Sequence, residues 1–148
     1  MDVQKAELLR GLSTDCATAI MDIAVQESYA AGASIFLRGD PAGHFYVLLM
    51  GQVKLHLGET GKVVNYVTRP GEIIGWSGLV GREVYSASAE CTTATELHKI
   101  ETGKLREIIE KNPVDGFVFF ENLSRILGDR LLQSYSQYDK VFVTSNLV

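Results

Sequence analysis

The sequence predicts a mainly β domain with helices at both ends. Between residues 26 and 96 apolar and polar side chains alternate in short runs, as in Val53-Lys54-Leu55-His56-Leu57, and this period of two is typical of half-buried strands. Glycines separate the runs, and Gly-Glu-Thr-Gly at residues 58–61 is a hairpin signal. Short strands at regular spacing predict a double-stranded β-helix, or jelly-roll barrel, over residues 26–101.

The composition is that of one globular domain. The 148 residues are 46% hydrophobic and carry a net charge of −4, with both signs interspersed, which is enough apolar content for one core. The negative charge argues against a nucleic-acid or membrane surface. Because the sequence has no run as apolar and long as a membrane span and no signal-peptide core, we expect a single cytoplasmic domain over residues 1–148.

Helical patterns flank the barrel on its N-terminal side. Residues 4–24 are expected to be helical, with Leu8, Leu9 and Leu12 on one apolar face. Ser13 or Thr14 can cap a second segment of this region. These helices, within residues 1–25, are expected to cover the side of the barrel.

A long helix is predicted after the barrel, within residues 102–140. A short helix ends near Lys111, and Asn112-Pro113 starts the next one with an N-cap residue and a proline at the first helical position. An apolar stripe runs from Phe117 to Tyr138, and a stripe this long needs a partner. We expect a homodimer through the 113–140 helix, the alternative being that the stripe packs only within the chain.

The glycine-rich segment, residues 70–89, is the candidate binding region. It holds glycines at 71, 75, 78 and 81 around the single tryptophan, Trp76. Dense glycines let backbone N–H groups approach a ligand and cradle an anion. The alternative is that these glycines only serve tight turns in a β domain.

The glycine-rich segment resembles the phosphate-binding cassette of the cyclic-nucleotide-binding domain family, which includes the catabolite activators and the regulatory subunits of cAMP-dependent kinase. Gly75 matches the family glycine, Leu79-Val80 its short helical turn and Ser86-Ala87 its Ser-Ala pair. Gly39-Asp40, Phe45-Tyr46-Val47 and Gly51-Gln52-Val53 resemble further family positions, so the resemblance covers residues 8 to 140. It implies a dimer made by the long helix, whose far end, here Gln133, Ser134 and Tyr135, approaches the nucleotide base.

The two charged anchors of the family are absent in this register. Trp76 stands at the position of the ribose-binding Glu, and Tyr85 at that of the phosphate-binding Arg. A second register, Gly71-Glu72 followed by Arg82, recovers both charges but puts Glu83-Val84 at the Ser-Ala position. We prefer the first register, in which cyclic AMP binding is doubtful. The expected ligand-binding residues are Gly75, Trp76, Ser77, Leu79, Tyr85, Ser86, Ala87, Gln133 and Ser134, with Glu72 and Arg82 as alternative anchors.

No pattern indicates an enzyme or a metal site. The three histidines, at 44, 56 and 98, form no close His-x-His pair, and no nucleophile or phosphate-loop motif is present. Cys16 and Cys91 are far apart in the sequence and are expected to be small buried hydrophobes. The sequence therefore predicts a non-catalytic protein without metal or cofactor.

We thus expect a regulatory sensor domain that binds a nucleotide or another small anionic ligand and signals through its C-terminal helix. One alternative is an interaction and dimerisation module that has lost its ligand. Another is the sensor part of a Crp/Fnr-type transcription regulator, because the winged helix of such regulators does not follow residue 140 in this sequence. An initiating Met and a short tail favour a complete small protein over a fragment.

Overall fold

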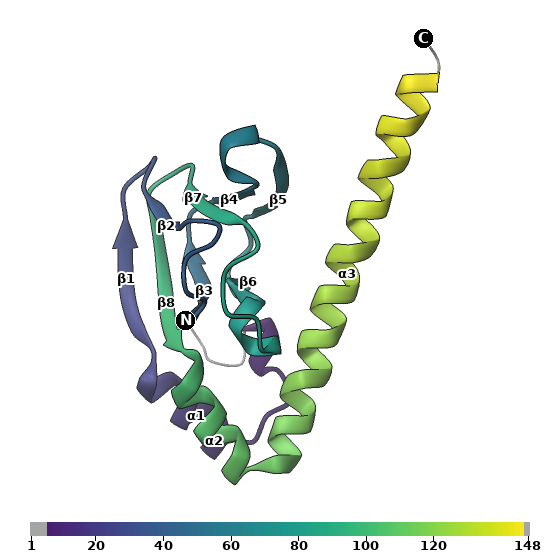
Figure 1. Cartoon of the computed structure of the whole chain (residues 1–148). Coiled ribbons are helices and arrows are strands. Elements are labelled where there is room, and N and C mark those ends of the chain that lie inside the picture. Colours follow the sequence, from purple (N-terminus) through teal and green to yellow (C-terminus); the bar gives the residue numbers. More distant parts are fainter. Residues whose placement is uncertain (1–5, 147–148) are drawn as a thin grey trace.

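The computed structural model describes residues 6–146, which form a β-barrel flanked by helices (Figure 1). Within these residues the strands are β1 (Val25–Tyr29), β2 (Ser34–Phe36), β3 (His44–Met50), β4 (Val53–His56), β5 (Val63–Val67), β6 (Ile73–Ile74), β7 (Ser88–Cys91) and β8 (Thr95–Glu101). The helices are α1 (Thr14–Ile23), α2 (Thr102–Lys111) and α3 (Pro113–Asn146), with 3-10 turns η2 (Glu7–Leu9), η3 (Gly58–Thr60) and η4 (Trp76–Val80). The predicted fold class is confirmed.

The barrel consists of two four-stranded antiparallel sheets. Their strand orders are β1-β8-β3-β6 and β2-β7-β4-β5. In the first sheet Phe45 pairs with Ile100, and in the second Val53 pairs with Cys91. One cluster of buried side chains fills the space between the sheets, with Leu48 from one sheet and Val53 from the other. This interior is the jelly-roll core that the alternating pattern predicts.

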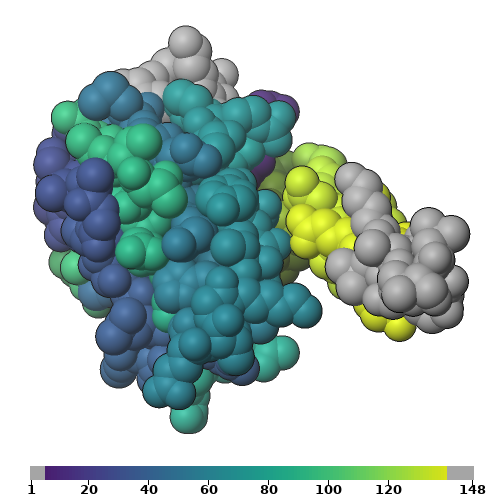
Figure 2. Space-filling view, turned by 90° about the horizontal axis from the view of Figure 1, so that it is seen from above, coloured from purple at the N-terminus to yellow at the C-terminus, as the bar shows by residue number. Residues whose placement is uncertain are grey.

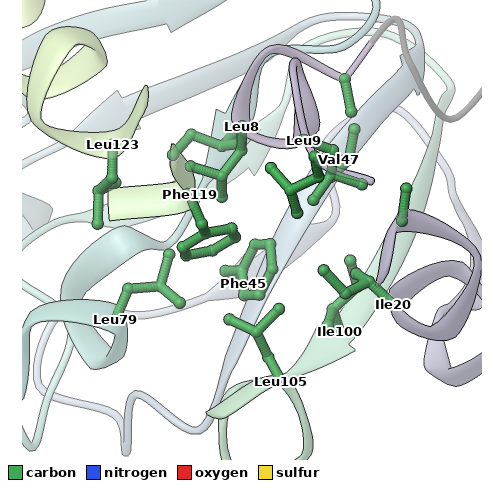
Figure 3. Close-up of a cluster of buried hydrophobic side chains, with 14 of the residues drawn as sticks. Leu8, Leu9, Ile20, Phe45, Val47, Leu79, Ile100, Leu105, Phe119 and Leu123 are labelled. Carbon is green, nitrogen blue, oxygen red and sulfur yellow. The ribbon is translucent and has the colours of Figure 1, made fainter. Parts of the chain in front are cut away.

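Strand β3 is buried on both faces, which explains its continuous apolar sequence. Tyr46 and Leu48 belong to the cluster inside the barrel. Phe45 and Val47 point the other way, into a second cluster between the barrel and the helices (Figure 3). Phe45 meets Phe119 of α3 there in an edge-to-face contact with the ring centroids 6.5 Å apart. Such buried side chains each stabilise the fold by about 1.5–3 kcal/mol.

The N-terminal region consists of two short helical pieces, in agreement with the second segment that Ser13 or Thr14 was expected to cap, and the first piece is shorter than the helical region expected from residue 4. Residues 4 and 5 lie outside the described part, η2 ends at Leu9 and α1 starts at Thr14. The Ser13 hydroxyl caps α1 by accepting a hydrogen bond from the Cys16 N–H, as the sequence allowed. A residue distant in sequence stabilises the chain between the two pieces. The buried Asn122 amide of α3 donates to the carbonyls of Leu8 and Arg10, at 3.0 and 2.7 Å.

The start of α3 is fastened to the same region. The Asp115 carboxylate accepts from the backbone N–H and the hydroxyl of Ser13, at 2.8 and 2.7 Å. The Asn112 amide, predicted as the N-cap of α3, donates instead to the Ile108 carbonyl of α2. An ideal Cβ at Gly116 would approach the Ile109 side chain to 2.5 Å, so α3 packs against α2 where a larger residue would not fit.

Beyond its base, α3 leaves the barrel and extends away from it (Figure 1). Phe119, Leu123 and Ile126 are buried, whereas every described side chain from Leu131 to Asp139 is exposed. Figure 2 shows this outer part, in yellow, beside the teal residues of the barrel. The buried face is therefore shorter than the predicted apolar stripe, and Phe117 at its start is 70% exposed.

Candidate functional site

A cavity of about 480 Å³ lies between the barrel and α3. Three parts of the chain line it: strands β4 and β5 with the turn after β4, the glycine-rich segment, and the middle of α3. We call it the helix-side cavity, and its lining residues are Leu55, Leu57, Val64, Asn65, Trp76, Ser86, Ala87, Leu127, Arg130, Leu131, Gln133 and Ser134. Most of these side chains are apolar, as in sites for small organic ligands.

The glycine-rich segment wraps tightly around the edge of the barrel. Gly75 and Gly81 flank η4 with φ angles of 81° each, in the left-handed region that favours glycine. A Cβ at Gly78 would collide with the carbonyl oxygen of Ala42. Gly75, Gly78 and Gly81 therefore serve turn geometry or close packing, which is the alternative to anion binding that the sequence left open.

Tyr85 fills the inner side of this segment. It is 4% exposed, and its ring stacks on Phe36 with the centroids 3.7 Å apart. Burial raises the pKa of its hydroxyl, which donates to the carbonyl oxygen of His44 at 2.6 Å. Tyr85 is therefore a core residue in this conformation, held by stacking and by a buried hydrogen bond.

Only a small space remains beside Tyr85. This inner hollow measures about 30 Å³ and is lined by Phe36, Leu55, Gly75, Trp76, Ser77, Tyr85, Ser86 and Ala87. It offers room for roughly two water molecules. The structure thus brings together six of the nine predicted ligand-binding residues around a space too small for a ribose phosphate.

Trp76 lies between the two spaces. It is half-buried and lines both the inner hollow and the helix-side cavity. Leu79, three residues on, is fully buried in the core beneath α2 and α3 and lines neither space. Its carbonyl accepts from the guanidinium of Arg106 at 2.9 Å. Of the residues in η4, Trp76 is the one placed to sense an occupant of the larger cavity.

Helix α3 supplies the opposite wall. Gln133 and Ser134, predicted from the family resemblance, both line the helix-side cavity, whereas Tyr135 is exposed and does not. The Ser134 hydroxyl donates back to the Leu131 carbonyl at 2.7 Å. Gln133 and Ser134 therefore face Trp76, Ser86 and Ala87 of the glycine-rich segment across one cavity.

Arg130 also lines this cavity, and the sequence analysis missed it. Its Nη2 donates to the Ile73 carbonyl at 2.5 Å, whereas its Nη1 is buried without a hydrogen-bond partner among the described residues. Burial lowers the pKa of Arg130, and the nearby carboxylates of Glu7 and Glu72 oppose this shift. Its spacing could have identified it, since Arg130 precedes Gln133 and Ser134 by three and four residues and so shares their helix face.

The alternative anchors lie elsewhere. Glu72 accepts from the Nε of Arg69 at 2.7 Å and lines a separate hollow of about 300 Å³ with Glu7 and Arg10. Arg82 is exposed on the turn after η4. Neither of these two side chains lines the helix-side cavity.

No metal centre is found in the described part of the chain. Among residues 6–146, no three or more His, Cys, Asp or Glu side chains are grouped as metal ligands would be. Cys16 and Cys91 are both buried, as predicted, and sit in different clusters. Burial raises the pKa of both thiols, so neither has the character of a reactive thiolate.

Comparison with known proteins identifies relatives of this chain. The family model described as cyclic nucleotide-binding domain matches residues 26–112. The chain is 27% identical over 126 residues to the potassium channel KAT3 of Oryza sativa subsp. japonica, covering 84% of this chain and 25% of the channel. It is 25% identical over 116 residues to the cAMP-dependent protein kinase regulatory subunit of Colletotrichum orbiculare, covering 78% and 29%. The chain thus spans less than a third of the length of these curated relatives.

Solved structures share the fold. A protein of Geobacter metallireducens GS-15, provisionally described as a cyclic nucleotide-binding protein, superposes with a TM-score of 0.76 at 28% identity, covering 88% of this chain and 98% of that one. The catabolite activator protein of Thermus thermophilus gives 0.72 at 24% identity, with coverages of 91% and 62%. The sensor domain of the regulator DNR from Pseudomonas aeruginosa gives 0.72 at 21% identity, with 87% and 88%.

The family model covers more than half of the chain, and the two sheets with their helical flanks match the solved structures. In residues 6–146 no helix has both the length and the apolar character needed to cross a bilayer. The chain therefore belongs to the cyclic nucleotide-binding domain family.

Proposed function

We propose that the protein is a non-catalytic regulatory domain that binds a small ligand in the helix-side cavity and transmits its occupancy through α3. The observation that carries this proposal is the cavity of about 480 Å³ between the glycine-rich segment and α3. Its walls come from parts of the chain that are far apart in sequence, so a ligand there would stabilise their relative positions. Family membership supports the assignment to ligand binding.

Cyclic AMP is not the expected ligand. Trp76 and Tyr85 occupy the two positions where the family resemblance places the Glu and Arg anchors, and Tyr85 is packed against Phe36. A hydrogen bond to a charged group contributes about 1.5–3 kcal/mol. Loss of both anchors would weaken binding by roughly a hundred- to ten-thousand-fold, with neighbouring losses not strictly additive.

Signalling is proposed to run through α3 and a second copy of the chain. Leu131 lines the cavity and is half exposed, and Leu132 on the neighbouring face is 64% exposed. A ligand that moves or orders this part of α3 would change the surface that a partner subunit meets. Such a device suits either a cytoplasmic stand-alone sensor or the sensor part of a larger regulator.

A thermal-shift screen tests the proposal. The full chain is heated alone and with cyclic AMP, cyclic GMP, other nucleotides and small organic acids, with Trp76 fluorescence as a second readout. A ligand raises the unfolding midpoint by mass action, and it should also change the emission of the half-buried Trp76. We expect no shift with micromolar cyclic AMP and a shift with another compound class. Micromolar binding of cyclic AMP by calorimetry would overturn the anchor assignment.

The second candidate function is a ligand-free interaction module. The stacked Tyr85 and the inner hollow of only about 30 Å³ favour it, because the inner part of the glycine-rich segment is packed as core. A chain of this class would show no midpoint shift with any compound, and filling the cavity by Ala87→Phe would leave its partner binding unchanged. The sensor would lose its ligand response in the same variant.

A further inference from the structure

Among the residues that line the helix-side cavity, Arg130 is charged, and the others are apolar or uncharged polar residues. Among the described side chains it forms no ion pair: Glu72 pairs with Arg69, and the Oε1 of Glu7 accepts from the Ile73 N–H. The two carboxylates act on Arg130 only through space. The guanidinium therefore keeps a charge that no direct contact neutralises.

The guanidinium also keeps an unused donor. Its Nη2 donates to the Ile73 carbonyl, but its Nη1 is buried and has no hydrogen-bond partner among the side chains and backbone that the structure describes. A buried cation with an unsatisfied donor is unfavourable, and retaining one at a cavity wall is the pattern of a binding site. Because Nη1 is covered in this conformation, the guanidinium must turn toward the cavity to meet a ligand.

The rest of the helix-side cavity selects an apolar body. Leu57, Trp76, Leu127 and Leu131 are among its apolar lining residues. The glycine-rich side has no cationic side chain on the cavity wall, and its inner part is closed by Tyr85. The charge of the site thus lies on α3, whereas the family resemblance places the phosphate anchor in the glycine-rich segment.

We propose that the helix-side cavity binds an amphipathic organic anion, with its apolar body against Trp76 and its single carboxylate, sulfonate or phosphate on Arg130. The inference rests on the ligand-binding function proposed above and names its ligand class. Such a ligand lies in the opposite orientation to a cyclic nucleotide held by family anchors. Bidentate pairing with the planar guanidinium would satisfy Nη1 and fix the anion at the helix.

A matched pair of probes tests the charge requirement. 1-Anilinonaphthalene-8-sulfonate carries one sulfonate on an apolar body, and N-phenyl-1-naphthylamine has the same ring system without the charge. Both are titrated against the full chain, with probe fluorescence and energy transfer from the single Trp76 as readouts. The Ala87→Phe variant, which fills the cavity, identifies the signal that comes from this site and not from exposed apolar patches elsewhere.

The variants are Arg130→Gln and Arg130→Met, which remove the charge, and Arg130→Lys, which keeps it. Arg125→Gln is the control, because Arg125 is an exposed arginine on α3 that pairs with Glu121 and does not line the cavity. We expect Arg130→Gln to weaken the sulfonate probe by roughly ten- to a hundred-fold, with the neutral probe unchanged. Arg130→Lys should restore part of the loss, and Arg125→Gln should change neither probe.

The outcomes separate this inference from the proposed function. Equal sulfonate affinity in the parent, Arg130→Gln and Arg130→Met proteins, with Ala87→Phe still blocking both probes, would overturn the role of Arg130 and leave a ligand cavity in place. Failure of Ala87→Phe to affect either probe would instead remove the cavity as a binding site, and the proposed function with it. Circular dichroism checks the fold of each variant, and Arg130→Met provides the answer if Arg130→Gln does not fold.

Discussion

The glycine-rich segment has two sides that differ in almost every physical property. Its inner side is packed, with Tyr85 stacked on Phe36 and a hollow of about 30 Å³. Its outer side faces α3 across a cavity of about 480 Å³ that Arg130 helps to line. One short segment thus belongs to the barrel core on one side and to a candidate binding site on the other.

In the proposed register, with the family anchors at positions 76 and 85, the fold is retained while the chemistry of its site changes. A large aromatic residue at position 85 adds buried area to the barrel and removes the space for a sugar phosphate. Ligand binding then depends on the residues of the helix-side cavity, which are mostly apolar and include one cation, Arg130.

Charged anchors introduced at positions 76 and 85 should turn the inner side of the glycine-rich segment into a binding site for a cyclic nucleotide. The double change Trp76→Glu with Tyr85→Arg supplies a carboxylate for a ribose hydroxyl and a guanidinium for a cyclic phosphate. We expect cyclic AMP affinity to rise by roughly a hundred- to ten-thousand-fold, measured by calorimetry. Without nucleotide the variant should melt at a lower temperature, because two aromatic contacts are lost and charges enter an enclosed site, and cyclic AMP should restore the midpoint.

The control for the anchor swap is Glu72→Ala with Arg82→Ala, which tests the second register. Neither side chain lines the helix-side cavity, so any native ligand response of the parent should survive. If the alanine pair abolishes that response and the folded swap variant shows no nucleotide affinity, the assignment of the anchors to positions 76 and 85 is wrong.

Truncation of Tyr85 should show that the inner side is core. Tyr85→Ala removes the stacked ring and should destabilise the protein by about 3–5 kcal/mol, the usual range for a buried aromatic residue. Tyr85→Phe removes only the hydroxyl that donates to His44 and should cost about 1 kcal/mol. Urea denaturation gives both values. A Tyr85→Ala protein as stable as the parent would mean that position 85 is not part of the core.

A charge on the exposed face of α3 should separate the proposed dimer. Leu132 is 64% exposed and does not line the helix-side cavity, so Leu132→Glu can test assembly without touching the site. If Leu132 is a hot spot of the interface, the change should weaken the dimer by at least about 2 kcal/mol, or roughly thirty-fold. Leu132→Met is the control. A parent protein that stays monomeric at tens of micromolar in sedimentation equilibrium would contradict the dimer.

The smallest expected effect concerns the anchor at the base of α3. Hydrogen bonds from the backbone N–H and the hydroxyl of Ser13 lower the pKa of Asp115 below its usual value. A carboxylate with a lowered folded pKa stabilises the protein above its unfolded pKa, and this contribution is lost as the pH falls through the folded value. Asp115→Asn should therefore lower the melting temperature at pH 7, and the difference should shrink as the pH falls through the folded pKa of Asp115. A pH-independent difference between the two proteins would exclude this linkage.

The fold was predictable because its signals are local and repeat. Alternation in β4 and glycine at the turns identify the strands, and Ser13 marks the start of α1. The second segment was therefore predictable from its cap, but the contact that supports the chain between η2 and α1 was not. The amide of Asn122, more than a hundred residues away, donates to the carbonyls of Leu8 and Arg10, and a local sequence pattern does not show so distant a contact.

The candidate site was predictable only in outline. Motif matching indicated Trp76, Gln133 and Ser134, which line one cavity. It did not indicate that Phe36 of β2 would stack on Tyr85, because the two residues are about fifty positions apart and come together only in the folded barrel. Arg130 was missed because the apolar stripe around it indicated a packing role for this part of α3. The binding role proposed for Arg130 depends on its burial at the cavity, which the sequence does not show.

The two ends of α3 differ in what keeps them helical. The base is held by buried Phe119, Leu123 and Ile126, whereas the side chains from Leu131 to Asp139 are exposed. An isolated helical stretch of this size is marginal in water, so backbone amides of the outer part should exchange with deuterium far faster than those of the base. A ligand in the helix-side cavity and a second subunit would each order the same stretch. Each would then favour the binding of the other through the entropy of helix formation, without any contact between them.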